Sequence, residues 1–304
     1  MLAELHPPRK ISVATPENWD VVIGKYSEFQ QASRVTPLWR DPYGPLVISR
    51  LGRPEAAEYR LHLGDDIQVD VLSGNKIVVV ARDGLDDTTL GHFLSDQVFP
   101  RMLAGSEELV LHAGAVRIGA GAALFIGASG LGKSTLVTSL DQAGSALMGD
   151  DAMVITSLDG DHYARPVYPS LRLMPDSIRA LLPADIETHP VANYTTKQRV
   201  DLPVASARSA LATTINAIFL LAVSPDEGQI KLRRLTIANA CMTYIENSFA
   251  LDPSDTARAR DRMEQASALA RQVPAFELSY PRDYARLPEV RQAILDQVAA
   301  LAPA

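Results

Sequence analysis

The stretch Gly127-Ala128-Ser129-Gly130-Leu131-Gly132-Lys133-Ser134-Thr135 decides how the middle of this chain folds. It matches in full the spacing G-x-x-x-x-G-K-[ST], in which backbone N–H groups at a helix N-terminus surround a polyphosphate. An apolar run, residues 122–126, comes directly before it, and a helical pattern over residues 135–143, closed by Gly144, follows it. A strand, a glycine loop and a helix in this order predict an α/β nucleotide-binding core.

The same pattern predicts roles for single residues in the glycine loop. All nine residues of the stretch are expected to line a site for ATP and Mg²⁺. Lys133 is expected to reach the β- and γ-phosphates, and the hydroxyl group of Ser134 is expected to complete the Mg²⁺ shell. The alternative is a glycine-rich turn with an incidental lysine, and the strand and helix on either side argue against it.

The second feature is the acidic pair Asp150-Asp151, which follows Gly149 and precedes the strand-like residues 153–156. Two adjacent carboxylates near a bound phosphate can hold Mg²⁺ and accept a proton from an attacking hydroxyl group. Aspartate-rich turns without any chemistry are common. Because a glycine loop of this kind lies nearby in the sequence, we expect the acidic pair to belong to the same site.

Several other polar residues are weaker candidates. His112 lies in an apolar, strand-like segment, where a histidine is more often a core residue than a catalytic one. The basic residues that follow the acidic pair are Arg165, Arg172, Lys197 and Arg199. Any of these could place positive charge on a transferring phosphoryl group, although spacing alone favours a solvated surface charge for each.

The chain is predicted to divide into a β-rich N-terminal module, residues 1–105, and a larger domain, residues 106–304. The predicted strands of the module include residues 67–71, which alternate apolar and polar, and residues 76–81. A helix is predicted to begin after a cap at Asp86 or Asp87 and to end near Pro100.

The larger domain alternates strand and helix patterns. Its predicted strands are residues 108–116, 122–126, 153–156, 217–223, 229–234 and 276–280. Its predicted helices are residues 135–143, 176–182, 237–248, 254–273 and 287–301. Residues 166–203 are rich in proline, threonine and charge, and we predict a long loop around residues 189–199.

The composition excludes several classes of protein. The 304 residues are 47% hydrophobic, which is too apolar for a chain that is mainly disordered. No apolar run approaches the ~20 residues of a membrane helix, and Cys241 as the single cysteine cannot form an internal disulfide. The net charge of −7 gives no overall attraction to nucleic acid or anionic membranes. Residues 1–8 lack a signal-peptide pattern, so a cytoplasmic protein is expected. Neither nucleic acid nor a membrane is expected as its partner.

Three of these features together resemble one known family. Leu111-His112 on a strand, the glycine loop and the acidic pair are similar to the catalytic core of the HPr kinase/phosphorylase family, whose fold is distantly related to the phosphoenolpyruvate carboxykinases. The resemblance implies an active site made of His112, Lys133, Ser134, Asp150 and Asp151. It implies Asp150 as the general base toward a serine hydroxyl group, with Asp151 and Ser134 around Mg²⁺. The order within the pair stays open.

Softer motifs along the chain resemble a shorter branch of HPr-kinase-like proteins. They are residues 96–103, residues 168–173, the run Lys197-Gln198-Arg199 and residues 278–283. Some members of this branch resemble lasso-peptide tailoring kinases, which phosphorylate the C-terminal serine of a ribosomally made precursor. The resemblance implies an ATP- and Mg²⁺-dependent serine kinase with a precursor peptide as its partner, and self-association is expected by analogy.

Catalytic charge neutralisation is expected from Arg172, Lys197 or Arg199, and His112 is expected to assist Asp150 in deprotonating the acceptor. The sequence departs from the family at Ser170, where a second signature would carry a glutamate associated with the metal. Three alternatives stay open. The same chemistry could act on HPr or on a small molecule, or the fold could bind nucleotide as a regulator without transfer. A motor or transporter ATPase ranks last, because no transporter-type signature is present.

Overall fold

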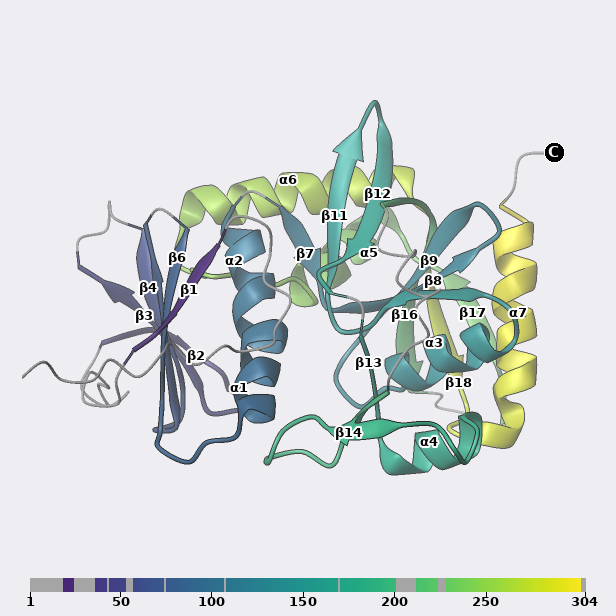
Figure 1. Ribbon diagram of the computed structural model, residues 1–304. Helices are drawn as coiled ribbons and strands as arrows, with labels where there is room; N and C mark the ends of the chain where they lie inside the picture. The colour runs from purple at the N-terminus through teal and green to yellow at the C-terminus, as the bar shows by residue number, and fades with distance from the viewer. Residues whose placement is uncertain are drawn as a thin grey trace, which may run out of the picture. The chain divides into compact units, whose positions relative to one another are not determined.

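A computed structural model gives the fold, shown as a ribbon in Figure 1. It describes residues 19–24, 36–42, 44–52, 57–73, 75–106, 108–168, 170–200, 212–223 and 228–301. The chain separates into two compact units. The first contains the chain up to Gly105 together with Ala250–Thr256, and the second contains Ser106–Phe249 and the residues from Ala257 onward. Among the described helices, none has both the length and the apolar character needed to cross a membrane.

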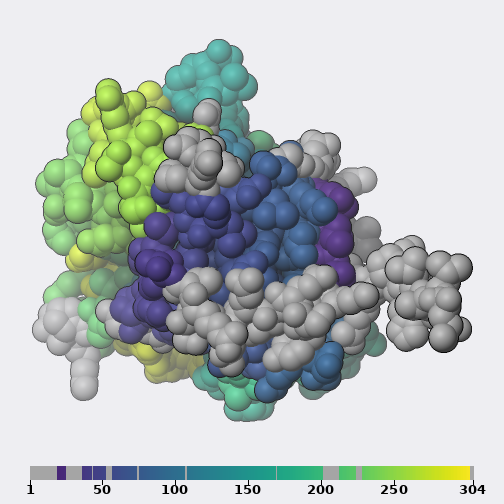
Figure 2. All heavy atoms as spheres, turned by 90° about the vertical axis from the view of Figure 1, so that its left-hand side faces the viewer, coloured from purple at the N-terminus to yellow at the C-terminus, as the bar shows by residue number. Residues whose placement is uncertain are grey.

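The first unit contains a six-stranded sheet with the order β1-β6-β5-β4-β3-β2. Its strands are β1 (Asp20–Ile23), β2 (Pro37–Arg40), β3 (Leu46–Leu51), β4 (Glu58–Leu63), β5 (Ile67–Leu72) and β6 (Lys76–Ala81). The two strands predicted in this region are confirmed as β5 and β6. β1 pairs parallel to β6, and the other neighbours are antiparallel. Figure 2 shows the atoms of this part of the chain in purple and blue on the face turned to the viewer.

A helix follows the sheet and runs further than the sequence predicts. It consists of α1 (Asp87–Phe93), a π-helical turn η4 (Leu94–Val98) and α2 (Phe99–Gly105). Asp86 is the N-cap, since its carboxylate accepts the backbone N–H of Thr89 at 2.7 Å. The predicted end near Pro100 is wrong. The N–H of Phe99 bonds to the carbonyl of Leu94, five residues back, so the backbone is already widened where the proline ring enters.

The second unit contains a nine-stranded mixed sheet. Its main path has the order β10-β8-β9-β16-β12-β11-β7, while β18 pairs with β16 and β17 pairs with β18. These strands are β7 (Leu109–Leu111), β8 (Ala113–Ile118), β9 (Gly121–Ile126), β10 (Ala146–Gly149), β11 (Met153–Leu158), β12 (Asp161–Pro166), β16 (Thr213–Val223), β17 (Lys231–Arg234) and β18 (Ala275–Tyr280). The unit is therefore of the mixed α/β class, and five of its six predicted strands are confirmed. Neither β10 nor β12 was predicted.

Helices cover both faces of this sheet. Leu124 and Ile126 belong to the core beneath α5 and α6, whereas Ala123 and Phe125 belong to the core beneath α3 and α7. Alternate residues of β9 thus point to opposite helical layers, which Figure 1 shows on the two sides of the sheet. The helices are α3 (Lys133–Gln142), α5 (Ile237–Glu246), α6 (Thr256–Gln272), η6 (Tyr284–Arg286) and α7 (Leu287–Ala299), and all but η6 were predicted.

The strand predicted for residues 108–116 is broken at His112. β7 pairs with β11, whereas β8 pairs with β9 and β10. At the break, the backbone N–H of His112 donates to the carbonyl of Asn247 at 2.7 Å. The prediction of one continuous strand is wrong because the chain changes partners there, which the apolar pattern alone cannot reveal.

The region predicted to be mainly loop contains a small sheet with the order β13-β15-β14. Its strands are β13 (Leu171–Leu173), β14 (Thr188–Pro190) and β15 (Gln198–Val200). The helix predicted nearby is confirmed as α4 (Pro175–Leu181). The predicted loop over residues 189–199 is wrong at both ends. Three-residue strands carry too little periodicity to be recognised from sequence.

Candidate active site

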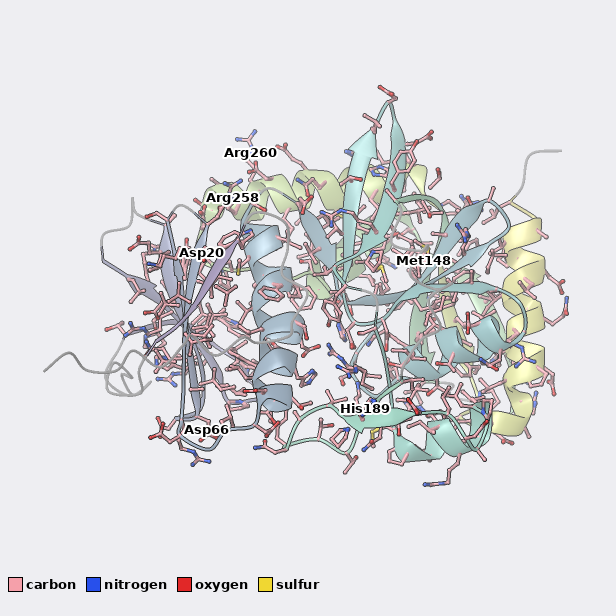
Figure 3. All side chains as sticks on the ribbon, in the orientation of Figure 1. Asp20, Asp66, Met148, His189, Arg258 and Arg260 are labelled. Carbon is pink, nitrogen blue, oxygen red and sulfur yellow. The ribbon has the colours of Figure 1, made fainter. Side chains whose placement is uncertain are left out.

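Strand pairing brings three separated segments to one edge of the large sheet. β8 is antiparallel to both β9 and β10, with Ala113 opposite Ile126 and Ala115 opposite Gly149. The ends of β9 and β10 therefore meet the beginning of β8. The glycine loop, the acidic pair and His112 all lie at this edge, and Figure 3 labels Met148 on β10 just before the pair.

The backbone conformation of the glycine loop, residues 127–134, requires glycine at three positions. Gly127, Gly130 and Gly132 have φ angles of 140°, 79° and 93°, which other residues rarely adopt. A Cβ on Gly127 would also lie 3.1 Å from the carbonyl oxygen of Leu221. Gly132 then serves as the N-cap of α3, so the loop ends at a helix N-terminus, as the sequence predicts.

Lys133 is buried at the base of this loop. Its Nζ donates to the carbonyl oxygens of Gly127 at 2.7 Å and Ala128 at 3.2 Å. These bonds hold a positive charge inside the curve of the loop. An anionic ligand there would meet the ammonium group directly.

Asp150 is completely buried, and neither carboxylate oxygen has a hydrogen-bond partner among the described residues. Burial raises the pKa of this carboxyl group to about 7, and the negative charge of Asp151 adds to the increase. The Ser134 hydroxyl group, which lies near the carboxylate without completing a hydrogen bond, and the charges of Lys197 and Lys133 lower this pKa. The pKa of Asp150 therefore lies near neutrality, and the charge of Lys133 in the glycine loop is one of the influences on it.

Asp151 is held in a conformation unusual for a residue with a side chain. Its φ angle is 73°, and its carboxylate accepts from Arg172 Nη1 at 3.2 Å. The ring nitrogen Nδ1 of His112 lies 2.8 Å from the carbonyl oxygen of Asp151, so this nitrogen carries the donated proton. Arg172 in turn donates to the Tyr168 hydroxyl at 3.0 Å. Two side chains from distant segments therefore fix the strained turn after β10.

The other predicted basic residues lie in different surroundings. Lys197 directly precedes β15, and its charge lowers the pKa of Asp150, which places it within electrostatic reach of the acidic pair. Arg199 lies opposite Arg172 in the small sheet. Arg165 pairs instead with Glu108 at 3.1 Å, on a part-exposed position of the large sheet. Arg165 is therefore engaged outside the site.

Gly114 on β8 lies against the buried carboxylate. A Cβ added there would be 3.1 Å from Asp150 Oδ1 and 3.0 Å from Val137 Cγ1. We expect Gly114→Ala to lower the free energy of unfolding by about 1–3 kcal/mol, because the core must move to admit the methyl group. Urea denaturation measures this change. An unchanged midpoint would contradict the position of Asp150 against β8.

Residues near the C-terminus complete the surroundings of the glycine loop. Arg282 Nη2 donates to the carbonyl of Gly130 at 2.6 Å, and a Cβ on Gly132 would lie 3.0 Å from the Tyr280 hydroxyl. From the middle of the chain, Ser177 on α4 also contacts this region, since its hydroxyl group forms a hydrogen bond with that of Thr135 at 3.0 Å. The resemblance to HPr-kinase-like proteins included residues 278–283. Their contact with the glycine loop could not be predicted, because the loop lies about 150 positions earlier in the chain.

The contact between Arg282 and Gly130 leads to a prediction. Removing it with Arg282→Gln should loosen the loop. The Kd for ATP, the ligand that the sequence predicts for this loop, should then rise about fivefold, as expected from the loss of ~1 kcal/mol. Isothermal titration calorimetry measures the change, with Arg233→Gln on exposed β17 as the control. Equal affinities for the two variants would show that Arg282 does not position the loop.

The residues at this edge fit a Mg²⁺ ion bound together with a nucleotide. Among the described residues, no group of three or more His, Cys, Asp or Glu side chains could hold a metal alone. Mg²⁺ usually takes one or two protein oxygens and completes its shell with water and substrate phosphates. The Ser134 hydroxyl group and the Asp151 carboxylate could supply oxygen ligands of this kind, and the unpartnered oxygens of buried Asp150 lie beside them.

Comparisons with known proteins were made for the whole chain. No family model matches it, and no curated protein matches its sequence. Among solved structures, it is similar to an Hpr(Ser) kinase/phosphatase from Coxiella burnetii, with 12% sequence identity and a TM-score of 0.36. That similarity covers 63% of this chain and 92% of the other.

Proposed function

We propose that this protein is an ATP- and Mg²⁺-dependent kinase that phosphorylates a serine hydroxyl group. One observation carries the proposal: a fully buried, unpartnered Asp150 carboxylate lies at the same sheet edge as a complete G-x-x-x-x-G-K-[ST] loop. A buried carboxylate without partners is costly to a fold. A general base for phosphoryl transfer supplies a reason to keep it.

The proposed roles follow from the contacts at this edge. The loop amides and Lys133 would bind the β- and γ-phosphates of ATP, and Arg282 would hold the loop in shape. When bound by Ser134 and Asp151, Mg²⁺ would neutralise charge on these phosphates. Asp150 would take the proton from the attacking hydroxyl group, because its pKa lies near neutrality.

Basic side chains would stabilise the transferring group in this proposal. Arg172 on β13 donates to the Asp151 carboxylate, and the charge of Lys197, just before β15, acts on Asp150. His112 would act indirectly, since its ring holds the carbonyl of Asp151 and thereby the turn that presents Asp150. Most of the rate enhancement would come from positioning and charge.

The proposed acceptor is the C-terminal serine of a ribosomally made precursor peptide of the lasso type. Two exposed apolar side chains support a peptide acceptor: Met174, just before α4, and Tyr194, between β14 and β15, offer apolar contacts close in sequence to Arg172 and Lys197. The proposal places the reaction in the cytoplasm, with self-association of the chain and with neither nucleic acid nor membrane as a partner.

A nucleotide-binding regulator is the second candidate, and Ser170 favours it. This residue replaces the glutamate implied by the resemblance, and its buried hydroxyl group has no hydrogen-bond partner among the described residues. A regulator would bind ATP tightly and transfer no phosphate to any acceptor.

An acceptor panel separates these possibilities. The protein is incubated with ATP, Mg²⁺ and one of three acceptors: a precursor peptide encoded near its gene, HPr, or free serine. Mass spectrometry then detects the gain of about 80 Da for one phosphoryl group. We expect the gain on the peptide. Phosphorylation of HPr alone would contradict a peptide acceptor, and ATP binding without any transfer would establish the regulator.

A further inference from the structure

The small sheet aligns three nitrogen-bearing side chains in one row. Arg199 on β15 lies directly opposite both Arg172 on β13 and His189 on β14. Residues directly opposite in an antiparallel pair project from the same face. All three side chains therefore share one face, and Figure 3 labels His189 on the edge strand.

The apolar residues on the other face of the small sheet determine which face carries the row. Leu171, Leu173 and Val200 alternate with the row and are buried in the core that includes α3. A shift of one residue in the register of β15 would bury the exposed Arg199 and expose Val200. The row is thus fixed by packing on the opposite face.

The row begins at the acidic pair and ends at the surface. Arg172 is 4% exposed and lies 3.2 Å from the Asp151 carboxylate, whereas Arg199 and His189 are exposed. Neighbouring strands are about 4.8 Å apart. The backbone positions of Arg199 and His189 therefore lie roughly 5 and 10 Å from that of Arg172 along the row.

Like charges directly opposite each other destabilise a strand pair unless negative charge lies beside them. The Asp151 carboxylate supplies such charge next to Arg172, and an anionic ligand along the row would add more. Arginine is well suited to a carboxylate, because its planar guanidinium group can donate two parallel hydrogen bonds. The glycine loop connects β9 and α3, not the strands of the small sheet. The proposed site for the nucleotide phosphates is therefore separate from the row.

We propose that Arg199 and His189 bind a carboxylate group of the acceptor, close to the hydroxyl group that receives the phosphate. This inference rests on the proposed kinase function and assigns specificity residues to it. The carboxylate would hold the acceptor with its hydroxyl group pointing along the row, toward the acidic pair. Two sources share this chemistry: the α-carboxylate of a C-terminal residue and an acidic side chain next to an internal serine.

Binding of defined peptides tests the proposal without requiring catalysis. The probes are three fluorescein-labelled hexapeptides: one ends in serine with a free α-carboxylate, one ends in serine amide, and one has aspartate before a terminal serine amide. Fluorescence anisotropy is measured with Mg²⁺ and a non-hydrolysable ATP analogue. The proteins are wild type, Arg199→Gln, His189→Gln and the control Arg179→Gln, which alters an exposed arginine on α4.

We expect wild type and Arg179→Gln to bind a carboxylate-bearing peptide at least tenfold more tightly than the plain amide. Arg199→Gln should reduce this ratio to below twofold, and His189→Gln should reduce it partly. The peptide that binds tightly identifies the source of the carboxylate. Circular dichroism and thermal melting confirm that each variant is folded.

Two results would overturn the inference: an acid-to-amide ratio that Arg199→Gln leaves unchanged, or no binding of any peptide to the wild type. A loss of affinity for the ATP analogue in Arg199→Gln, with the ratio intact, would assign the row to the nucleotide instead. Carboxylate-dependent binding without phosphorylation of the bound peptide would contradict the kinase function alone. Phosphorylation without preference for a carboxylate would contradict this inference alone.

Discussion

Asp150→Asn is expected to abolish phosphoryl transfer while the protein still binds ATP. Asparagine has nearly the same shape but cannot accept a proton, and the loss of a general base costs about 10²–10⁴-fold in rate. Single-turnover assays with labelled ATP measure the rate. Asp159→Asn, in the exposed turn between β11 and β12, is the matched control and should keep full activity.

The same substitution should stabilise the protein at neutral and alkaline pH when Mg²⁺ and nucleotide are absent. The pKa of Asp150 rises from an ordinary value near 3.8 to about 7 in the fold. Between these values the folded state binds more protons than the unfolded chain, so the wild-type free energy of unfolding decreases as pH increases. Asparagine avoids this loss.

Thermal melts with EDTA at several pH values measure this effect. The gain from Asp150→Asn should be absent near pH 4 and complete above pH 7, where it reaches up to about 4 kcal/mol. A gain of equal size at every pH would show that Asp150 titrates as in an unfolded chain. A variant that still transfers phosphate at the wild-type rate would contradict the assigned base.

Lys133→Met is expected to weaken ATP binding about 10- to 100-fold. The ammonium group is buried against the carbonyl oxygens of Gly127 and Ala128, and its removal takes away charge-assisted hydrogen bonds to the phosphates. Calorimetric titration of ATP in the presence of Mg²⁺ measures the affinity. Lys76→Met, an exposed position on β6, serves as the control and should bind normally.

AMP provides a further comparison for this variant. Because AMP has no β- or γ-phosphate, its weaker binding should differ little between Lys133→Met and wild type. An equal loss of affinity for ATP and AMP would indicate general damage to the loop. Unchanged affinity for ATP would show that the phosphates bind elsewhere, and the proposed active site would then be wrong.

Local patterns predict the central strand, the glycine loop and the helix after it. The spacing of Gly127, Gly132 and Lys133 is sufficient, because the conformation of the loop depends on adjacent residues. The pattern also indicates the acidic pair at the end of a strand. What the sequence does not show is that Asp151 adopts a left-handed conformation held by Arg172.

The remaining features depend on pairing between distant segments. His112 interrupts a strand because its backbone bonds to Asn247, 135 positions later, and nothing in the apolar pattern marks this partner. Arg282 reaches Gly130 only after the last strand of the sheet is in place. Likewise, the row from Arg172 to His189 requires the register of three very short strands.

Phosphorus NMR of the complete reaction tests the central claim most directly. The protein is mixed with ATP, Mg²⁺ and the serine-terminated peptide, and the phosphorus resonances are followed over time, with Asp150→Asn in a parallel sample. The account predicts equal amounts of ADP and phosphoserine in the wild-type sample and neither product in the variant. ADP with inorganic phosphate alone, or ATP that stays unchanged with every acceptor, would contradict a kinase built on Asp150 and the glycine loop.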